Sequence, residues 1–417
     1  MPERLSRDDD LSADFRLLRD IYQRALDRCT PERLVLRAID RDPLDGTFDV
    51  AAVGKCAAGL LAGAAARVEI ARAFLAVPQG YPITVPMEAE IAFGSHPQLD
   101  SASFDAGDRL QRFVSSSLHP LLVLVSGGAS ASVELPLIPW FSEDDVRHVN
   151  AILLRSGLPI DRMNVVRKHI SGIKGGRLIT SISSSCTTLV YSDVAPGRLA
   201  DVGSGPTLPD PSTNEDAAAI LERLSDPRCR SAAVLLRSGE VPETPKALRG
   251  AVRLIADNTD LVAAAADAAV ELGVSASPLG VSLDDDVESG ARRLLASIRL
   301  SDHRVLLVAG GEPTITVQGD GKGGRCSELA LRFLRAAAAE HLRFSALFGS
   351  SDGVDGNSGA AGVYIDDGAA AKTAVGEIDD AIAASDSFGL VQRIGEPIMM
   401  QPTGNNLRDL FLLMARG

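Results

Sequence analysis

The sequence predicts an α/β protein with a parallel sheet and two domains. Short apolar strands alternate with helices, and several strands end in glycine-rich turns, such as Gly54-Lys55 and Ser126-Gly127-Gly128. Of the 417 residues, 45% are hydrophobic, which is enough to fill more than one core. Because ligands of such folds collect at the carboxyl ends of the strands, these turns are the first places where a site is expected.

Predicted elements of the first half begin with an amphipathic helix, where apolar residues from Phe15 to Ala25 recur at helical spacing. After it, strands and helices alternate: a strand at 48–53, a helix at 56–68, a strand at 74–77, a helix at 106–113, strands at 121–125 and 187–191, and a helix at 214–224. The polar, proline-containing stretch 225–245 then indicates a domain boundary. We place it between residues 240 and 241.

Residues 241–417 form the second, smaller α/β domain in this prediction. Its elements are strands at 252–256, 305–308, 314–317 and 344–348, helices at 259–272 and from Ser327 onward, and a last helix after 401–406. That last helix could pack back on the first domain, which comprises residues 1–240.

Composition restricts the partners of the protein. A net charge of -13 and a pI near 5.0 argue against a nucleic-acid or membrane surface, because phosphate groups are held by clustered Lys and Arg. The five cysteines include no Cys-x-x-Cys pair and suggest neither a zinc ribbon nor a disulfide framework. The charged N-terminus does not read as a secretory signal, and no apolar run has the length of a membrane span. We expect a cytoplasmic monomer or homodimer.

The densest motif lies between Gly310 and Glu328. Strand 314–317 leads into four glycines that carry Lys322 and Arg325 to the start of a helix: Gly319, Gly321, Gly323 and Gly324. Glycines let backbone N–H groups approach an anion, the helix N-terminus adds partial positive charge, and the cations add full charges. The motif therefore predicts a phosphate-binding loop, with a mobile hairpin tip as the alternative.

The same glycines fit Gly-x-Gly-x-x-Gly, so dinucleotide binding is a second alternative. Its context is poor, because strand 314–317 alternates in polarity and Glu340 falls inside the following helix. Neither Gly54-Lys55 nor Gly321-Lys322 continues into the Ser or Thr of a P-loop.

Two strand-end turns in the first half could bind anions. Lys55 follows a buried strand where a helix dipole favours an anion, so its ammonium is a candidate for a phosphoryl oxygen, and a surface or capping lysine is the alternative. The next turn offers N–H donors and two hydroxyls, from Ser126, Gly127, Gly128 and Ser130. A serine nucleophile is conceivable there, although the segment lacks Gly-x-Ser-x-Gly.

Residues 164–178 form the densest basic segment, with Arg167, Lys168, Lys174 and Arg177. In an acidic protein these cations create a local positive field, which we expect to face an anionic ligand. A solvated helix face is the alternative, but Gly175-Gly176 interrupts the helix where a plain surface helix would avoid glycine.

Acids and polar turns complete the candidate site. Asp193 follows strand 187–191 and could be a metal ligand or a general base, with a helix N-cap as the alternative. Ser204 and Gly205 lie in another turn that is rich in N–H donors.

In the second half, Asp352 belongs to a glycine and acid cluster at 349–356 that could hold a divalent cation or form an ordinary turn. The cluster is no EF-hand, because position 363 is Val. Glu312, Thr403 and Asn405 add polar groups near the other motifs.

Taken together, these segments resemble the glycerate 2-kinases whose C-terminal half is called the MOFRL domain, which are often described as hydroxypyruvate reductases. The resemblance covers nearly the whole chain and rests on Gly54-Lys55, residues 94–100 with His96-Pro97, Ser126-Gly127-Gly128, residues 164–178, Ser192-Asp193-Val194, residues 204–213, Gly310-Gly311-Glu312, Gly323-Gly324-Arg325, residues 351–356 and Pro402-Thr403-Gly404.

The resemblance implies a Rossmann-like N-terminal domain, a smaller C-terminal α/β domain and an active site in the cleft between them. It also implies ATP-dependent phosphorylation of glycerate at its 2-hydroxyl with Mg²⁺ or another divalent cation, and it places Lys55 and Arg325 closest to the chemistry. We expect both cations to stabilise the transferring phosphoryl group, Asp193 to activate the hydroxyl or bind the metal, and Asp352 to assist the metal. The expected nucleotide and substrate ligands are Ser126, Gly127, Gly128, Ser130, Lys168, Lys174, Arg177, Ser204, Gly205, Glu312, Gly323, Gly324, Thr403 and Asn405.

Three segments depart from the family pattern. Asn-Gln-Glu is replaced by Cys326-Ser327-Glu328, Gly-Asp-Asp by Gly197-Arg198-Leu199, and Pro-Thr-Asp-Ala-Ala-Gly by residues 357–362, with Gly359 in place of the acid. The lost acids leave room for an altered metal site or another hydroxy acid as substrate. An NAD(P)-dependent hydroxypyruvate reductase and a non-catalytic nucleotide or metabolite sensor are the other hypotheses.

Overall fold

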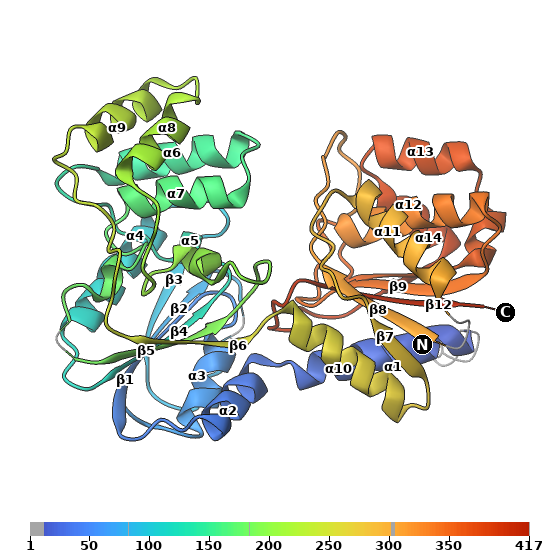
Figure 1. The fold of residues 1–417 in the computed structure, drawn as a ribbon, viewed down its shortest axis with the longest axis horizontal. Helices are drawn as coiled ribbons and strands as arrows, with labels where there is room; N and C mark the ends of the chain where they lie inside the picture. The colour runs from blue at the N-terminus through green and yellow to red at the C-terminus, as the bar shows by residue number, and fades with distance from the viewer. Residues whose placement is uncertain (1–11, 82, 183, 302–304, 417) are drawn as a thin grey trace, which may run out of the picture. The chain divides into compact units, whose positions relative to one another are not determined.

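A computed structural model describes residues 12–81, 83–182, 184–301 and 305–416 (Figure 1). The chain forms two compact units. We call residues 31–257 the parallel unit and residues 1–30 with 258–417 the mixed unit, after the sheets that they contain.

The parallel unit is built on a six-stranded sheet in the order β3-β2-β1-β4-β5-β6, in which every neighbouring pair is parallel. Its strands are β1 (Thr47–Val53), β2 (Glu69–Pro78), β3 (Glu90–Gly94), β4 (Leu121–Ser126), β5 (Cys186–Tyr191) and β6 (Ala251–Ala256). The central strands β1 and β4 are almost completely buried, as expected for a parallel sheet that helices cover on both faces.

Helices of the parallel unit fall into two groups. α2 (Pro31–Arg41) and α3 (Ala57–Ala65) lie on one face of the sheet, and α4 (Ser101–Ser115) and α5 (Ala129–Ser132) lie on the other (Figure 1). These four helices cover the sheet and form the first group. The other group consists of four helices that gather at one end of the unit around a separate hydrophobic core: α6 (Glu143–Arg155), α7 (Ile160–Ile170), α8 (Asn214–Glu222) and α9 (Pro227–Arg237). Two short 3₁₀ helices, η1 (Arg177–Ile179) and η2 (Leu199–Ser204), connect these layers.

The strand order reverses between β1 and β4. From β1 the chain moves outward through β2 and β3, and it then returns to β4 and continues outward through β5 and β6 on the other side. This order is that of the dinucleotide-binding Rossmann fold, and such a reversal leaves a crevice at the carboxyl ends of the two central strands. Gly54-Lys55 and Ser126-Gly127-Gly128 lie at that crevice.

The mixed unit contains a six-stranded sheet in the order β11-β10-β9-β12-β8-β7, in which only the pair β7/β8 is parallel. Its strands are β7 (Ser275–Pro278), β8 (Val305–Gly311), β9 (Phe344–Ser350), β10 (Gly362–Asp366), β11 (Glu396–Ile398) and β12 (Asp409–Ala415). The helices are α1 (Ala13–Arg28), α10 (Asn258–Glu271), α11 (Val287–Leu300), α12 (Arg325–Ala339), η3 (Asp367–Lys372), α13 (Val375–Ala383) and α14 (Ser387–Ile394). α1 and α10 cover one face of the sheet, and α11, α12 and α14 cover the other (Figure 1).

The division between the two units differs from the predicted boundary at 240/241: it falls at 257/258, and the first 30 residues belong to the mixed unit. β6 pairs with β5, so the parallel unit continues to Asp257. α1 belongs to the mixed unit, where Tyr22 donates a hydrogen bond to the carbonyl of Ser350 (2.5 Å) and Phe15 stacks on Tyr364. The predicted strands and helices of both halves otherwise correspond to observed elements, with the exceptions given next.

Two predicted elements were wrong, and the stretch that was expected to mark the domain boundary contains a helix. The final element is the strand β12 instead of a helix, because its apolar run is buried between β8 and β9, and periodicity does not separate buried strands from buried helices. Residues 314–317 form only an isolated bridge, from Thr314 to Asp286. The stretch 225–245 contains α9, which begins at Pro227 after the N-cap Asp226.

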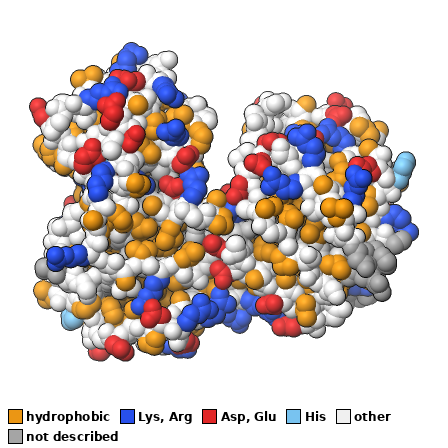
Figure 2. All heavy atoms as spheres, viewed as in Figure 1, with side chains coloured by type: hydrophobic (Ala, Val, Ile, Leu, Met, Phe, Trp, Pro, Cys, Tyr) orange, Lys and Arg blue, Asp and Glu red, His pale blue; other side chains and the backbone are white. Residues whose placement is uncertain are grey.

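Charged side chains of both signs are interspersed on the face shown in Figure 2, over both units. In the part of the chain that the structure describes, no helix is both long enough and apolar enough to cross a bilayer. All five cysteines are buried thiols.

Candidate active site

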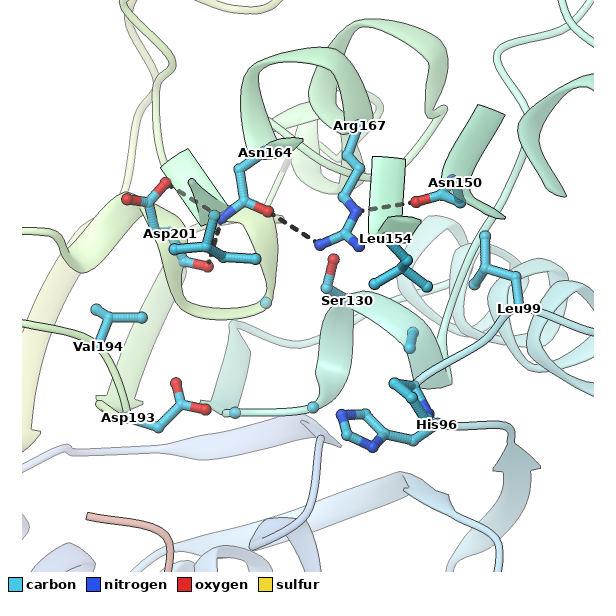
Figure 3. A pocket seen from close by; sticks show the side chains of 16 residues that line it. His96, Leu99, Ser130, Asn150, Leu154, Asn164, Arg167, Asp193, Val194 and Asp201 are labelled. Atoms are coloured by element: carbon cyan, nitrogen blue, oxygen red, sulfur yellow. Dashed lines mark hydrogen bonds between the residues drawn. The ribbon is translucent and has the colours of Figure 1, made fainter. Parts of the chain in front are cut away.

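A pocket opens in the parallel unit at the reversal of strand order. Its volume is about 240 Å³, and it is lined by His96, Pro97, Leu99, Gly127, Gly128, Ser130, Ala131, Asn150, Leu154, Ile160, Asn164, Arg167, Asp193, Val194, Asp201 and Gly203 (Figure 3). The lining comes from the turns after β3, β4 and β5 and from helices α6 and α7. The pocket thus lies where a doubly wound sheet binds its ligands.

The turns after β1 and β4 hold each other in place beside this pocket. The backbone N–H of Lys55 donates to the carbonyl of Gly127 (2.8 Å), and that of Cys56 donates to Oγ of Ser126 (3.1 Å). Gly128 has a φ of 81°, and a Cβ there would lie 2.9 Å from Cγ of Lys55. The stem of Lys55 therefore crosses directly over Gly128, and only glycine leaves it this path.

Arg167 projects from α7 into the pocket and is 8% exposed. Its Nε donates to Oδ1 of Asn150 (2.9 Å), and Nη1 lies 3.4 Å from Oδ1 of Asn164 (Figure 3). Burial lowers the pKa of the Arg167 guanidinium from its ordinary value, and a guanidinium nevertheless stays charged near neutral pH.

Two carboxylates, Asp193 and Asp201, line the pocket as well. Asp201 accepts hydrogen bonds from Nδ2 of Asn164 (3.3 Å) and from Nε of Arg198 (2.9 Å). Arg198, which stands where the family has an acid, thus neutralises an acid of the pocket wall. Asp193 lies opposite His96 in the view of Figure 3, at the end of β5 as predicted.

His96 reports the electrostatic field of the pocket. Burial, together with the positive charges of Lys55 and Arg167, lowers its pKa to about 4. The imidazole is therefore neutral near pH 7 and adds no positive charge to the pocket.

The predicted basic segment separates into residues with different surroundings. Lys168 is buried between Asp210 (3.3 Å) and Asp201 (3.9 Å). Lys174 is buried against Glu134, to which its ammonium donates. Arg177 donates to the backbone carbonyls of Pro242 (2.8 Å) and Glu243 (3.4 Å). These three cations bind groups of the protein itself and do not line the pocket. Arg167 lines the pocket.

Ser204 and Gly205 also have structural partners. Ser204 adopts a φ of 59°, and its Oγ lies 2.7 Å from Oγ of Ser130 and donates to Oδ1 of Asn164 (3.1 Å). Gly205 has a φ of 59°, and a Cβ there would lie 2.7 Å from the carbonyl oxygen of Ala200. Of the two serines, Ser130 lines the pocket. Ser204 contacts both Ser130 and Asn164 and thereby positions these two pocket residues.

The helix that follows the glycine loop of the mixed unit has an internal partner at its N-terminus. The N–H groups of Cys326 and Ser327, at the start of α12, donate to the buried carboxylate of Asp355 (2.9 Å each). Gly323 donates to Oδ1 of Asn357 (2.7 Å), and a Cβ at Gly324 would lie 2.1 Å from Oδ1 of Asp355. An acid of the chain therefore occupies the helix N-terminus at which a phosphate was expected.

Arg325 is similarly engaged. Its guanidinium donates to both oxygens of the buried Asp409 (2.5 and 2.8 Å) and lies 3.4 Å from Glu312, which also faces Arg408 (3.6 Å). Pairing with Asp409 raises the pKa of Arg325 well above its ordinary value. Burial raises the pKa of Asp409 more than the guanidinium lowers it.

The remaining candidates of the mixed unit form local turns. Asp352 accepts from Oγ of Ser350 (2.8 Å) and from the N–H of Val354 (2.9 Å). Thr403 donates to the carbonyl of Ser351 (2.5 Å), and the buried Asn405 donates to the carbonyl of Leu26 (3.1 Å).

Within the described ranges, no three His, Cys, Asp or Glu side chains are grouped as metal ligands. Mg²⁺ is usually held by one or two carboxylates together with substrate phosphates. The pocket carboxylate Asp193 fits such a site. Asp201 pairs with Arg198, and Asp352 accepts hydrogen bonds within its own turn, so the metal role of Asp352 stays a prediction.

Sequence reasoning missed Asn150, Asp201 and Asp409. Asn150 lies in the middle of α6 and Asp201 in η2, outside any glycine-rich turn. Arg167 was predicted to face an anion as part of the basic segment, but the same prediction covered its neighbours Lys168 and Lys174. Partner geometry alone separates them.

Comparison with known proteins gives matches over both units. Residues 17–235 match a domain of unknown function, DUF4147, and residues 305–409 match the MOFRL family. Glycerate 2-kinase of Sulfurisphaera tokodaii is 31% identical over 87% of this chain and 89% of its own length. A protein of Agrobacterium vitis that is provisionally named hydroxypyruvate reductase is 32% identical over 94% of this chain and 93% of its own.

The crystal structure of glycerate kinase from Thermotoga maritima superposes with a TM-score of 0.83 at 29% identity, over 96% of this chain and 99% of that one. An α/β fold with a DUF4147 half and a MOFRL half thus defines the class of protein. The chain belongs to the MOFRL-containing glycerate 2-kinase family, as the sequence motifs predicted.

Proposed function

We propose that this protein catalyses the ATP-dependent phosphorylation of glycerate, or of a closely related small hydroxy acid, at its 2-hydroxyl. The products are ADP and, from glycerate, 2-phosphoglycerate. The observation that carries the proposal is the pocket at the β1/β4 reversal, which Arg167 and Asp193 line and beside which the turn of Lys55 is bound to Gly127. Both substrates are anions, and family membership supports the same reaction.

Phosphoryl transfer requires mainly positioning and neutralisation of charge. In our proposal, Asp193 accepts the proton of the substrate's 2-hydroxyl while the oxygen of that hydroxyl forms a bond to the γ-phosphorus of ATP. The bond from that phosphorus to the bridging oxygen breaks, and ADP leaves with the electron pair. Lys55 neutralises the charge that develops on the phosphoryl oxygens.

A divalent cation, proposed as Mg²⁺, would supply further neutralisation of the nucleotide phosphates. The alternative role of Asp193 is to bind this cation instead of accepting the proton of the 2-hydroxyl. Asp201 lines the same pocket. For Arg325 we retain the expected contribution to phosphoryl stabilisation, which has to be separated experimentally from its structural pairing with Asp409. We further propose that the enzyme works in the cytoplasm on small molecules, as a monomer or homodimer.

A hydroxypyruvate reductase is the second candidate, favoured by the strand order of the parallel sheet and by the names of two relatives. Two observations weigh against it. The first turn of this sheet reads Gly54-Lys55-Cys56-Ala57 instead of Gly-x-Gly-x-x-Gly, and the loop that does fit this pattern binds Asp355 at its helix.

A coupled assay distinguishes the two candidates. One arm measures ADP release from ATP and Mg²⁺ with D-glycerate, and the other measures NADH and NADPH oxidation with hydroxypyruvate. We expect saturable, glycerate-dependent ADP release and no reductase activity. Reduction of hydroxypyruvate without ADP release would replace the proposal by the reductase.

A further inference from the structure

We propose that Arg167 binds the carboxylate of the hydroxy-acid substrate in the pocket of the parallel unit, and that Asn150 and Asn164 hold its guanidinium for that purpose. This inference rests on the proposed function, because the substrate class comes from it. It adds the residue that recognises the acid group and thereby selects hydroxy acids over neutral alcohols.

The first observation is that Arg167 is a buried cation whose protein partners are neutral. It is 8% exposed and donates to two side-chain amide oxygens, those of Asn150 and Asn164. No carboxylate in the described part of the chain forms an ion pair with it; Glu134, whose charge acts on Arg167, is bound by Lys174. Buried charges are normally paired, so this guanidinium is prepared for an anion that the protein does not provide.

The second observation is that both amides are fixed with their oxygens toward the guanidinium. Nδ2 of Asn150 donates to the carbonyl of Val146 (2.9 Å), and Nδ2 of Asn164 donates to Asp201. Oγ of Ser204 donates to Oδ1 of Asn164 as well (3.1 Å). Since a guanidinium has five N–H groups and the amides use two, the remaining groups are left for a ligand.

The two buried lysines beside Arg167 are surrounded differently, whereas the buried Arg177 donates to backbone carbonyls. Lys168, the next residue, pairs with Asp210, and Lys174 pairs with Glu134. Arg167 differs from Arg177 in lining the pocket, where its remaining N–H groups can reach a ligand. The chain supplies acids to its buried lysines here and amides to its pocket arginine.

Size and charge favour a small carboxylate over a nucleotide polyphosphate. The pocket of about 240 Å³ is smaller than the roughly 300–1,000 Å³ of sites that hold drug-sized ligands. Asp193 and Asp201 line the same pocket and would repel several phosphate charges. They can instead accept hydrogen bonds from the hydroxyls of a hydroxy acid, while a guanidinium binds a carboxylate through two parallel N–H groups.

The test compares Arg167→Gln with Arg162→Gln, a control on the same helix whose side chain is exposed. We expect Arg167→Gln to raise the KM for D-glycerate by about 10- to 100-fold, since it removes hydrogen bonds from a charged group. The KM for ATP should change less than about twofold. Arg167→Lys, which keeps the charge but lacks the planar pair of N–H groups, should recover part of the affinity.

Equilibrium binding of D-glycerate without nucleotide, measured by calorimetry, separates the failure of this inference from the failure of the proposed function. Wild-type turnover with an unchanged KM for glycerate in Arg167→Gln would overturn the inference alone. An increase confined to the KM for ATP would assign Arg167 to the nucleotide phosphates and overturn it too. If the wild type neither binds nor phosphorylates D-glycerate, both proposals fail. Should Arg167→Gln not fold, Arg167→Lys carries the same comparison.

Discussion

The two units each present a glycine-rich turn with a cation, but they use its hydrogen-bond donors differently. At the β1/β4 reversal of the parallel unit, Arg167 lines a pocket, Lys55 packs against its lining residues Gly127 and Gly128, and the partners of Arg167 are neutral amides. In the mixed unit, Asp355 fills the N-terminus of α12, and Asp409 holds Arg325 through both of its oxygens. The same residue types thus form a prepared ligand site in one unit and an internally paired network in the other.

This difference teaches that glycines and cations in a sequence indicate where backbone donors are accessible, and not whether the chain itself already occupies them. A phosphate-binding turn and a turn closed by a buried aspartate have similar local sequences. The acid that decides between them can lie far along the chain: Asp355 is 29 residues from Cys326, and Asp409 is 84 residues from Arg325.

The largest effect is expected from breaking the pair in the mixed unit. Arg325→Ala leaves the fully buried Asp409 without its cation, which should lower the free energy of unfolding by about 3–5 kcal/mol and remove most of the turnover. Urea denaturation and kcat measure the two effects. Lost turnover with wild-type stability would show that Arg325 serves a ligand as Arg167 does, and the contrast between the units would disappear.

Lys55→Ala tests the other side of the comparison. Removal of this cation should lower kcat by about 10²–10³-fold, the usual cost of a lost group that stabilises transition-state charge. The melting temperature should stay close to that of the wild type. Lys372→Ala, at an exposed position of η3, is the matched control. A loss of stability comparable to the loss of activity would indicate that Lys55 supports the turn instead of the reaction.

Asp355→Ala should destabilise the mixed unit by about 2–3 kcal/mol. The change removes the acceptor of two buried N–H groups at the start of α12 and acts like the loss of a helix cap. Denaturation in urea gives the value. An unchanged stability together with new binding of inorganic phosphate would mean that the helix N-terminus accepts an external anion as readily as Asp355.

The smallest effect concerns the charge of the pocket. Burial is the largest cause that lowers the pKa of His96 to about 4, and it remains in Lys55→Ala and Arg167→Gln. The pKa should rise only part of the way toward 6.5 in each variant, because each change removes one of the positive charges that act on the imidazole. Titration by NMR measures this shift. Since the folded pKa lies below the unfolded one, His96 contributes stability above pH 6.5 that is lost as the pH falls toward 4. A pKa that stays near 4 in both variants would show that neither positive charge acts on His96.

Much of the fold could be predicted from the sequence because buried parallel strands are short, apolar and followed by glycine turns. β1, β4 and β5 are of this kind, and the positions of Lys55, Gly128 and Asp193 follow from them. β12 was misassigned because an apolar run that is buried on both sides has no periodicity to reveal its state. The extent of each unit depended on tertiary pairing, of β6 with β5 and of α1 with the mixed sheet, which no local pattern contains.

The candidate site was predictable to the level of its turns and not of its side-chain partners. The sequence alone does not distinguish Arg167 from Lys168 and Lys174, because all three are cations of one basic segment. Only their partners, two amides in one case and acids in the others, distinguish a ligand residue from internal ion pairs. Asn150 and Asp201 carry no sequence signal, because asparagine and aspartate at helix positions are common on protein surfaces.

The most direct test of this account is a crystal structure of the protein with D-glycerate bound. The account predicts the glycerate carboxylate at the guanidinium of Arg167, its hydroxyls among Ser130, Asp193 and Asp201, and Asp355 still at the N-terminus of α12. Glycerate or phosphate bound at the start of α12, with Asp355 displaced and the pocket of the parallel unit occupied by solvent alone, would contradict it.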